Sequence, residues 1–310
     1  MSASLRVFAP ATVANVACGF DILGFALEQP GDELTMYYHG DQSGIRIENH
    51  SDIADMPLDP TRNTLGVSLQ AFCDALGHSG GFEIHLTRKV RPGSGIGSSS
   101  ASAAASVFAA NELLGRPYDR HQLVAFAMEG ERAACGTAHA DNVAPALMGG
   151  FVLVRSYKPL EVVALDYPEE LYCAVVHPQI ELKTADARRV LRRDIPLRSA
   201  VVQWGNIAGL VAGLYKKDYG LIGRSLEDVV VEPMRSVLIP GYAQAKAAAM
   251  EAGALGASIS GSGPSLFALT ASRSVAEAVS VAVEAAFAAL DIPSIGYVSS
   301  INGTGARVLE

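Results

Sequence analysis

The residue types best suited to chemistry lie between Pro92 and Ser102, a segment that reads Pro-Gly-Ser-Gly-Ile-Gly-Ser-Ser-Ser-Ala-Ser. Glycines alternate at positions 93, 95 and 97, and an alanine-rich stretch without a helix breaker runs on to Leu114. Glycine permits a tight turn and close backbone approach, and the start of a helix adds unpaired N–H groups and partial positive charge. We therefore expect this segment to bind a polyphosphate.

This glycine segment differs from three other nucleotide-binding patterns. No Gly-Lys-Ser or Gly-Lys-Thr follows it, as a P-loop requires, and Ser98 stands where a dinucleotide fingerprint counted from Gly93 needs its third glycine. The sequence also lacks the His-Arg-Asp and Asp-Phe-Gly of protein kinases. The alternative reading is structural, in which the Gly/Ser turn only begins a helix.

Carboxylate and amide side chains supply the second half of the expected chemistry. Asn15 and Asp21 bracket a glycine turn, and Glu131 lies near the end of a predicted helix. Residues 139–142 add a histidine, an aspartate and an asparagine, and residues 261–263 form a second Gly-Ser-Gly turn. Hard oxygen ligands beside a phosphate loop suit Mg²⁺, which bridges phosphate oxygens.

Five segments, in order along the chain, resemble the GHMP kinase family of galacto-, homoserine, mevalonate and phosphomevalonate kinases. Residues 92–102 are similar to its motif P-x-G-x-G-L-G-S-S-A, and residues 257–264 to its C-terminal glycine motif. Residues 11–24, the run His-Ala-Asp-Asn-Val-Ala-Pro at 139–145 and Glu-Pro-Met-Arg at 232–235 resemble the branch whose acceptor is L-homoserine.

The resemblance implies a fold and a reaction. The fold is α+β with two lobes: an ATP-binding lobe like ribosomal protein S5 domain 2 over residues 1–168, and a ferredoxin-like lobe over residues 169–310. The reaction is the ATP-dependent phosphorylation of the L-homoserine hydroxyl to O-phospho-L-homoserine, a step of threonine biosynthesis.

The resemblance also assigns the donor side of the site. Glu131 and the Ser98 hydroxyl would hold Mg²⁺, and Asn142 would orient the acceptor, so these three form the expected catalytic set. The residues expected to bind ATP are Pro92, Gly93, Ser94, Gly95, Ile96, Gly97, Ser98, Ser99, Ser100, Ala101, Ser102, Asn63, Thr64, Gly261, Ser262 and Gly263. Asn63 is also placed to cap a helix.

A zwitterionic amino alcohol needs a group for its ammonium and another for its carboxylate. Asp21 and Asp141 suit the ammonium. Arg188 and Arg235 suit the carboxylate, because a planar guanidinium binds it through two hydrogen bonds. The polar residues expected to complete the cage are Asn15, His139 and Thr184.

Two groups could accept the proton of the substrate hydroxyl. No lysine lies in the N-terminal motif, and we interpret Lys89 as a charge at a strand end. We favour direct passage of the hydroxyl proton to a phosphate oxygen, and the alternative makes Asp141 a base. Two other hypotheses are a kinase for another acceptor, such as mevalonate or shikimate, and a catalytically silent nucleotide-binding relative.

The composition of the chain indicates which partners and which cellular location to expect. The chain has 310 residues, of which 49% are hydrophobic, and a net charge of −8. This acidic balance argues against nucleic acid or an anionic membrane as the main partner. Four cysteines at positions 18, 73, 135 and 173 form no C-x-x-C pair, so we expect buried thiols and a cytoplasmic location. Apolar runs at 229–231 and 238–239 favour a homodimer.

Periodicity and breakers predict the elements that must position these residues. Strands are expected at 5–9, 33–39, 44–47, 81–88, 151–156, 171–177, 266–270 and 295–300, and helices at 63–76, 103–114, 119–135, 184–193, 200–215, 241–251 and 275–290. Residues 10–19, 136–145 and 253–265 are expected to be turns or loops.

Overall fold

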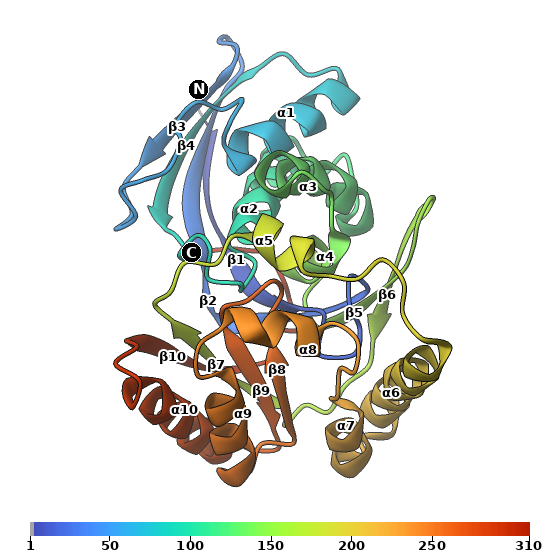
Figure 1. The fold of residues 1–310 in the computed structure, drawn as a ribbon. Helices are drawn as coiled ribbons and strands as arrows, with labels where there is room; N and C mark the ends of the chain where they lie inside the picture. Colours follow the sequence, from blue (N-terminus) through green and yellow to red (C-terminus); the bar gives the residue numbers. More distant parts are fainter. Residues whose placement is uncertain (1–2) are drawn as a thin grey trace.

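The computed structural model describes residues 3–310, apart from the side chain of Cys135. Two sheets organise the chain, a seven-stranded one in the upper part of Figure 1 and a four-stranded one in the lower part. Helix α5 (Thr184–Arg189) lies at the level where the two parts meet. The mixed, irregular order of strands and helices confirms the α+β prediction.

The upper sheet leads into the glycine segment, which connects β4 to α2. Its main path runs β11-β1-β2-β4-β3, and β5 extends the sheet from β2 and is followed by β6. The strands are β1 (Ala3–Ala14), β2 (Leu23–His39), β3 (Ile45–Asn49), β4 (Gly81–Arg88), β5 (Phe151–Tyr157), β6 (Leu160–Leu165) and β11 (Arg307–Val308). The helices are α1 (Thr64–Leu76), α2 (Ser98–Leu113), α3 (Arg120–Cys135) and α4 (Ala140–Met148).

Helix α2 is the centre of this upper part. It packs against β1, α1 and α3, and residues 100–111 are all buried. Its alanines and serines let the surrounding elements approach closely, while Val107 and Phe108 fill the core that they enclose. This composition therefore serves packing on every side of the helix, and its start is held in place by the core.

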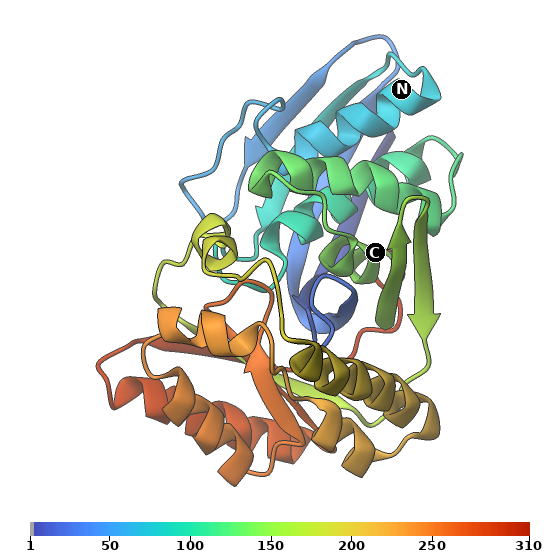
Figure 2. The ribbon, with the colours of Figure 1, turned by 45° about the vertical axis from the view of Figure 1, so that its right-hand side comes forward.

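The lower sheet is antiparallel in the order β10-β7-β9-β8. Its strands are β7 (Tyr172–Pro178), β8 (Gly256–Ile259), β9 (Leu266–Thr270) and β10 (Ser294–Ser300). Helices α9 (Tyr242–Glu251) and α10 (Arg273–Ala288) pack against it. Figure 2 shows α6 (Leu197–Lys216) and α7 (Tyr219–Ser225) side by side at the opposite edge. Helix α8 (Glu232–Arg235) continues into the 3₁₀ turn η1 (Ser236–Leu238).

One of the three apolar clusters that the described residues form joins the two sheets. Phe25 of β2 lies 4.7 Å from the ring of Phe151 and 6.1 Å from that of Phe267 in the lower sheet, measured between ring centroids. The chain also returns at its end, because β11 pairs with β1. A division of the chain between residues 168 and 169 stays a prediction.

Several expected elements differ from those observed. Strand β1 extends to Ala14, β6 and β8 were not predicted, and α5 ends four residues before the predicted 193. The expected loop at 136–145 contains the first six residues of α4, which is Ala140–Met148. Pro145 lies within this helix, where its missing N–H removes only one hydrogen bond, to the carbonyl of Asp141.

The apolar runs expected to cover a dimer face are partly core. Val231 is 7% exposed and Ile239 is 2% exposed, so both pack within the chain. Cys18, Cys73 and Cys173 are buried free thiols, whereas the side chain of Cys135 lies outside the described part. Over residues 3–310, none of the helices has both the length and the apolar character that crossing a bilayer requires.

Candidate active site

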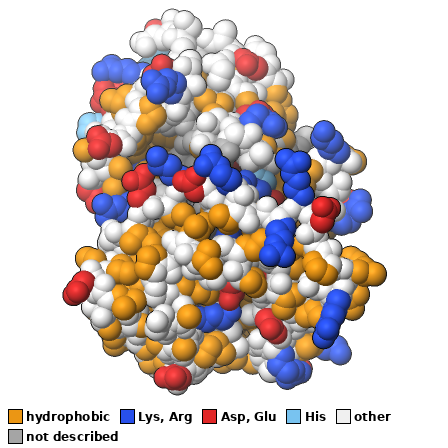
Figure 3. Space-filling model, in the orientation of Figure 1, with side chains coloured by type: hydrophobic (Ala, Val, Ile, Leu, Met, Phe, Trp, Pro, Cys, Tyr) orange, Lys and Arg blue, Asp and Glu red, His pale blue; other side chains and the backbone are white. Residues whose placement is uncertain are grey.

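A cavity of about 410 Å³ gathers most of the predicted site residues. On its wall are Asn15, Asp21, Asn63, Thr64, Pro92, Gly93, Gly95, Gly97, Ser98, Ser99, Ser102, Glu131, His139, Asp141, Asn142, Thr184, Arg188, Arg235, Gly261 and Ser262. Of the predicted residues that the structure describes, five are buried behind this wall instead: Ser94, Ile96, Ser100, Ala101 and Gly263. Figure 3 shows charged side chains gathered across the middle of the molecule, near the level of α5.

The glycines of the loop are required by its shape. Gly93, Gly95 and Gly97 have φ angles of +74°, +78° and +67°, which other residues rarely adopt. A Cβ atom on Gly97 would lie 2.1 Å from the Thr12 hydroxyl oxygen. Gly97 is also the N-cap of α2, and because glycine has no side chain, the cap residue itself accepts no hydrogen bond from the amides that begin this helix.

Two other segments hold the loop from behind. The Ser260 hydroxyl donates to the Gly95 carbonyl at 2.8 Å, and the Ser265 hydroxyl donates to the Ser94 carbonyl at 2.6 Å. From β1, the Thr12 amide donates to the Ile96 carbonyl at 3.1 Å. The second glycine turn thus fixes the first, although the two are more than 150 residues apart in the sequence.

Lys89 is the residue that sequence reasoning missed. Its side chain is only 7% exposed, and its Nζ lies 3.2 Å from the Asp32 carboxylate. It also donates to the Ser98 carbonyl and hydroxyl at 2.7 and 2.6 Å. Lys89 directly follows β4, as the strand-end interpretation expected, but its charge is buried, paired with Asp32 and placed on the cavity wall.

Asp32 holds this lysine in place. The carboxylate is fully buried in β2 and accepts hydrogen bonds from the Val90 amide at 2.7 Å and the Ser102 hydroxyl at 2.5 Å. A buried carboxylate needs a cation and donors to offset its lost hydration. The sequence signal was Asp32 itself, an aspartate directly before the strand expected at 33–39, which would need a cation if it were buried.

Glu131 of α3 faces the cavity from the side opposite the sheet. It is 5% exposed, and this burial raises the pKa of its carboxyl group, while hydrogen bonds from the Ser99 and Ser100 hydroxyls act to lower it. The Ser100 hydroxyl donates to Glu131 Oε1 at 2.8 Å. A divalent cation beside this carboxylate would favour its charged form.

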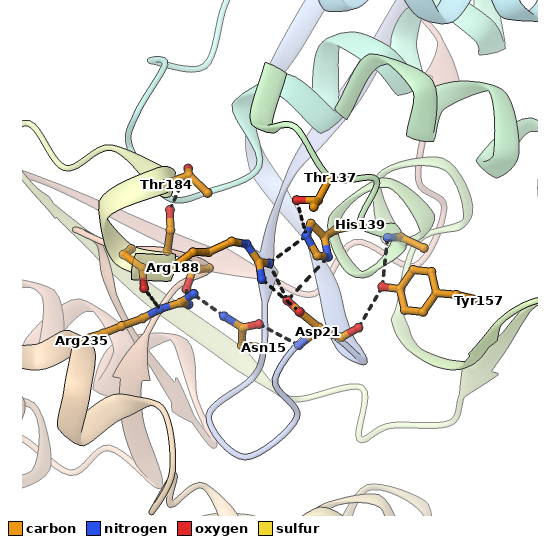
Figure 4. Close-up of polar contacts among 12 residues, drawn as sticks. Asn15, Asp21, Thr137, His139, Tyr157, Thr184, Arg188 and Arg235 are labelled. Atoms are coloured by element: carbon orange, nitrogen blue, oxygen red, sulfur yellow. Dashed lines mark hydrogen bonds and ion pairs between the residues drawn. The ribbon is translucent and has the colours of Figure 1, made fainter. Parts of the chain in front are cut away.

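Asp21 and Arg188 are paired with each other in this structure. Figure 4 shows the Arg188 guanidinium directed at both carboxylate oxygens of Asp21, with Nη2–Oδ1 at 2.9 Å and Nη1–Oδ2 at 3.3 Å. His139 Nε2 lies 2.8 Å from Arg188 Nη2. Burial lowers the pKa of His139, which favours the neutral ring that can accept this bond.

Asp141 and Arg235 are the more deeply buried charges of the site. Asp141 is 2% exposed, and burial, followed by repulsion from Asp21 and Glu131, raises its pKa to about 7. Arg235 is also 2% exposed, and burial lowers its pKa to about 10. It donates to the Ala187 and Gly261 carbonyls at 3.0 and 2.9 Å. Its charge is thus oriented by backbone dipoles at the cavity wall.

The neutral polar residues mainly orient backbone and side chains around these charges. Asn15 donates to the Gly261 carbonyl at 2.7 Å and accepts from the Asp21 amide at 3.0 Å. Thr184 and Ser262 hydroxyl oxygens are 3.2 Å apart. Asn142 accepts from the Thr12 hydroxyl at 2.8 Å, beside Gly97.

Asn63 serves the helix cap that the sequence also allowed. Its side-chain oxygen accepts from the Leu65 amide at 2.9 Å, and its amide nitrogen donates to the Pro57 carbonyl at 2.6 Å. A contact to a nucleoside, which the resemblance assigns to Asn63 and Thr64, stays a prediction. Both residues lie on the cavity wall.

Two family models match this chain. The GHMP kinases N terminal domain covers residues 63–150, and the GHMP kinases C terminal model covers residues 210–289. The homoserine kinase of Chlorobium phaeobacteroides is 50% identical over 318 residues, with 99% of each chain covered. The homoserine kinase of Xanthomonas campestris is 42% identical and covers 98% of this chain and 94% of its own.

Solved structures agree with the sequence comparison. A crystal structure of homoserine kinase from Cytophaga hutchinsonii has a TM-score of 0.95 and 53% identity, covering 99% of this chain and 97% of that one. Leishmania major mevalonate kinase, solved with R-mevalonate, has a TM-score of 0.70 at 16% identity and covers 95% of each chain, so it shares the fold alone.

Proposed function

We infer the activity of this chain from its membership of the GHMP kinase family, in the branch formed by the homoserine kinases. It transfers the γ-phosphoryl group of ATP to the side-chain hydroxyl of L-homoserine and releases ADP and O-phospho-L-homoserine. The observation that carries this conclusion for the chain's own residues is the cavity, whose wall includes the glycine turn, a buried carboxylate and a buried guanidinium.

The glycine turn is the proposed phosphate site. Backbone amides of residues 93–99 would hold the phosphate oxygens, and the partial positive charge at the start of α2 adds to their effect. Lys89 places a full positive charge beside Ser98. Because phosphoryl transfer depends on positioning and charge neutralisation, this arrangement addresses the main need of the reaction.

The part of the cavity wall formed by Asp141 and Arg235 is the proposed amino-acid site. Asp141 would bind the ammonium group, and Arg235 would bind the carboxylate through its guanidinium. The ion pair of Asp21 and Arg188 already satisfies much of each partner's charge, so we assign it the supporting role of enclosing the substrate. His139, Asn15 and Thr184 complete the polar wall.

We propose that the acceptor proton passes directly to a phosphate oxygen. Asn142 would orient the hydroxyl, since it lies where the glycine turn meets α4. Asp141 as a general base is the competing proposal. A pKa of about 7 is compatible with a general base and also with a carboxylate that binds the ammonium group only when it is ionised. Kinetic measurements are therefore needed to distinguish the two roles.

The residues present fit Mg²⁺. Glu131 offers a buried carboxylate whose raised pKa a cation would reverse. The Ser98 hydroxyl donates to the Val90 carbonyl and accepts from Lys89, which leaves one lone pair for a metal ligand. When bound, Mg²⁺ would neutralise charge on the phosphates.

A panel of matched acceptors tests the assignment. ADP release is measured with L-homoserine, with 4-hydroxybutyrate, which lacks the ammonium group, and with 3-amino-1-propanol, which lacks the carboxylate. Mevalonate and shikimate are included, and ³¹P NMR identifies the product. Turnover with L-homoserine alone is expected. Faster turnover of an acceptor without an ammonium group would contradict the role given to Asp141, and nucleotide binding without turnover on any alcohol would indicate a silent relative.

An oligomer and a compartment are separate proposals. We propose a homodimer that uses α6, where Leu197, Val201 and Trp204 are 71%, 57% and 59% exposed at helical spacing. Analytical ultracentrifugation tests this, and a monomer at micromolar concentration would contradict it. The buried free thiols of Cys18, Cys73 and Cys173 support a reducing compartment such as the cytoplasm.

A further inference from the structure

Two histidines and two glutamates meet on the outer face of the upper sheet, away from the cavity. Strands β3 and β4 run parallel, and their register sets Glu48 beside His85. Side chains two residues apart in a strand share a face, so His50, just after β3, belongs with Glu48, and Glu83 with His85. The opposite face at Ile47 and Ile84 is buried in the core, and β3 is the outermost strand of this path.

The distances between these side chains match those between ligands of one metal ion. His50 Nε2 lies 3.3 Å and His85 Nε2 lies 3.5 Å from the same oxygen of Glu48, Oε2. One ligand atom from each of the three residues falls within 4.8 Å of the other two. A tetrahedral ion with bonds of about 2.0–2.1 Å separates its ligand atoms by about 3.3–3.4 Å. We propose that Glu48, His50 and His85 form a binding site for Zn²⁺.

The ligand types favour a transition metal over Mg²⁺ or Ca²⁺. Imidazole nitrogen with carboxylate oxygen suits Zn²⁺, Cu²⁺ and Ni²⁺, whereas the alkaline-earth ions take oxygen ligands alone. Glu83 Oε1 lies 2.7 Å from His85 Nε2, which is a hydrogen-bond distance, so Glu83 would have to move away from this nitrogen before both could be ligands of one ion. The ring of His85 packs against Tyr37 and His50, at 4.9 and 5.1 Å between centroids, which restrains its orientation.

One cation competes for this position. Arg46 Nη2 contacts the other oxygen of Glu48, Oε1, at 2.6 Å, and its side chain is 70% exposed. The two contacts use different oxygens, so the arginine does not have to leave when an ion binds Oε2. Exposed pairs of this kind contribute little energy in water.

The site is open to solvent and held by a rigid frame. The side chains of Glu48, His85 and His50 are 29%, 26% and 51% exposed, so an ion reaches them directly. Two of the ligands sit on paired strands whose backbone is fixed by the core beneath. An ion here would tie the edge strand β3 to β4 and stabilise the fold by binding the folded state alone.

Calorimetric titration of the nucleotide-free full chain with ZnCl₂ tests this proposal. The expected result is one site in the wild type. The double variant His50→Gln/His85→Gln should bind Zn²⁺ more than about 100-fold more weakly. Loss of a residue that only contacts a ligand lowers metal affinity by roughly 10–100-fold, so a larger decrease is expected when two ligands are removed. His121→Gln is the matched control, because His121 is an exposed histidine on α3, and it should bind Zn²⁺ like the wild type. Equal Zn²⁺ binding by the double variant and the wild type would overturn the proposal.

Four further measurements test whether the binding is specific to this site. Glu48→Gln keeps the side-chain shape and should also lose the ion, whereas Glu131→Gln, in the cavity, should retain it. Saturating Zn²⁺ should raise the Tm of the wild type and of His121→Gln, but not that of the double variant. Co²⁺ should give the visible spectrum of a tetrahedral complex with the wild type, and an octahedral spectrum would count against the site. Kinase activity of the double variant without added Zn²⁺ should equal that of the wild type, because neither histidine lines the cavity.

Discussion

Replacement of Asp141 by asparagine separates the two roles that its carboxylate could have. The side chain is 2% exposed, and its pKa is raised to about 7 by burial and by the charges of Asp21 and Glu131. As an ammonium site, Asp141 must be ionised before L-homoserine binds. As a general base, it must be ionised for the chemical step. The first role controls KM and the second controls kcat.

The size of the effect follows from that pKa. The ionised fraction of a group with a pKa of about 7 falls about tenfold between pH 8 and pH 6, and the apparent affinity for a ligand of the ionised form falls by the same factor. The wild-type KM for L-homoserine should therefore rise about tenfold over this range, while kcat at saturation stays nearly constant because the bound ammonium keeps Asp141 ionised.

Steady-state kinetics from pH 6 to pH 8, at saturating ATP and Mg²⁺, provide the assay. Asp141→Asn should have a high KM at every pH and lose the pH dependence of KM. Any titration of ATP itself would survive in the variant, which makes the variant its own control. A wild-type KM that stays flat while kcat falls with pH, together with an Asp141→Asn kcat near zero at unchanged KM, would refute the reasoning and identify a base.

Stability gives an independent check on the same carboxylate. Folding raises the pKa of Asp141 from 3.8 to about 7, so this group's contribution to stability is present below pH 3.8 and is lost as the pH rises to 7. The loss amounts to about 4 kcal/mol. Asp141→Asn should thus raise the free energy of unfolding at pH 8, and the gain should shrink toward pH 4. Urea unfolding at both pH values measures it, and an equal effect at both would contradict the raised pKa.

Three more variants probe the donor and acceptor ends of the cavity. Gly97→Ala should unfold at a lower temperature than Gly93→Ala and should raise the KM for ATP more. Both glycines have positive φ, but of the two only Gly97 would place a Cβ atom 2.1 Å from another atom. Equal effects of the two substitutions would show that the clash is relieved. Asp32→Asn should lower the free energy of unfolding by about 3–5 kcal/mol in urea titrations, since it leaves the Lys89 charge buried without its partner, and a loss below 1 kcal/mol would show that the pair is hydrated. Arg235→Lys should raise the KM for L-homoserine about tenfold or more and leave the KM for ATP unchanged, and the reverse pattern would place Arg235 at the nucleotide.

The sequence predicted well those elements whose signals are local. Helix α1 begins after the predicted cap Asn63, and α3 begins after Asp119, the first residue of the predicted helix 119–135, with a capping box of Asp119 and Gln122. Strand β4 has the predicted bounds because its alternating apolar side chains pack on one face. These signals come from neighbouring residues, so no tertiary contact is needed to interpret them.

Elements that depend on distant partners were missed. Strand β8 has only four residues, all buried, and its sequence Gly-Ala-Ser-Ile shows no alternation. Helix α4 contains Pro145, whose cost is offset by packing of Val143 and Leu147 in the core. In both cases burial against other parts of the chain overrides local propensity.

The candidate site was predicted in its residue types and less well in its pairings. Asp21 and Arg188 were assigned to opposite ends of a substrate, yet they contact each other at 2.9 Å. Lys89 was interpreted only as a charge at a strand end, because Asp32, its partner, lies 57 positions earlier. Pairings of this kind depend on the register of strands, which a single sequence leaves open.

The most direct test of the central claim is a crystal structure with a non-hydrolysable ATP analogue, Mg²⁺ and L-homoserine. The account predicts phosphate density against the amides of residues 93–99, with the amino acid between Asp141 and Arg235 and its hydroxyl directed at the terminal phosphate. A nucleotide bound elsewhere, or an amino acid whose ammonium group is away from Asp141, would contradict it.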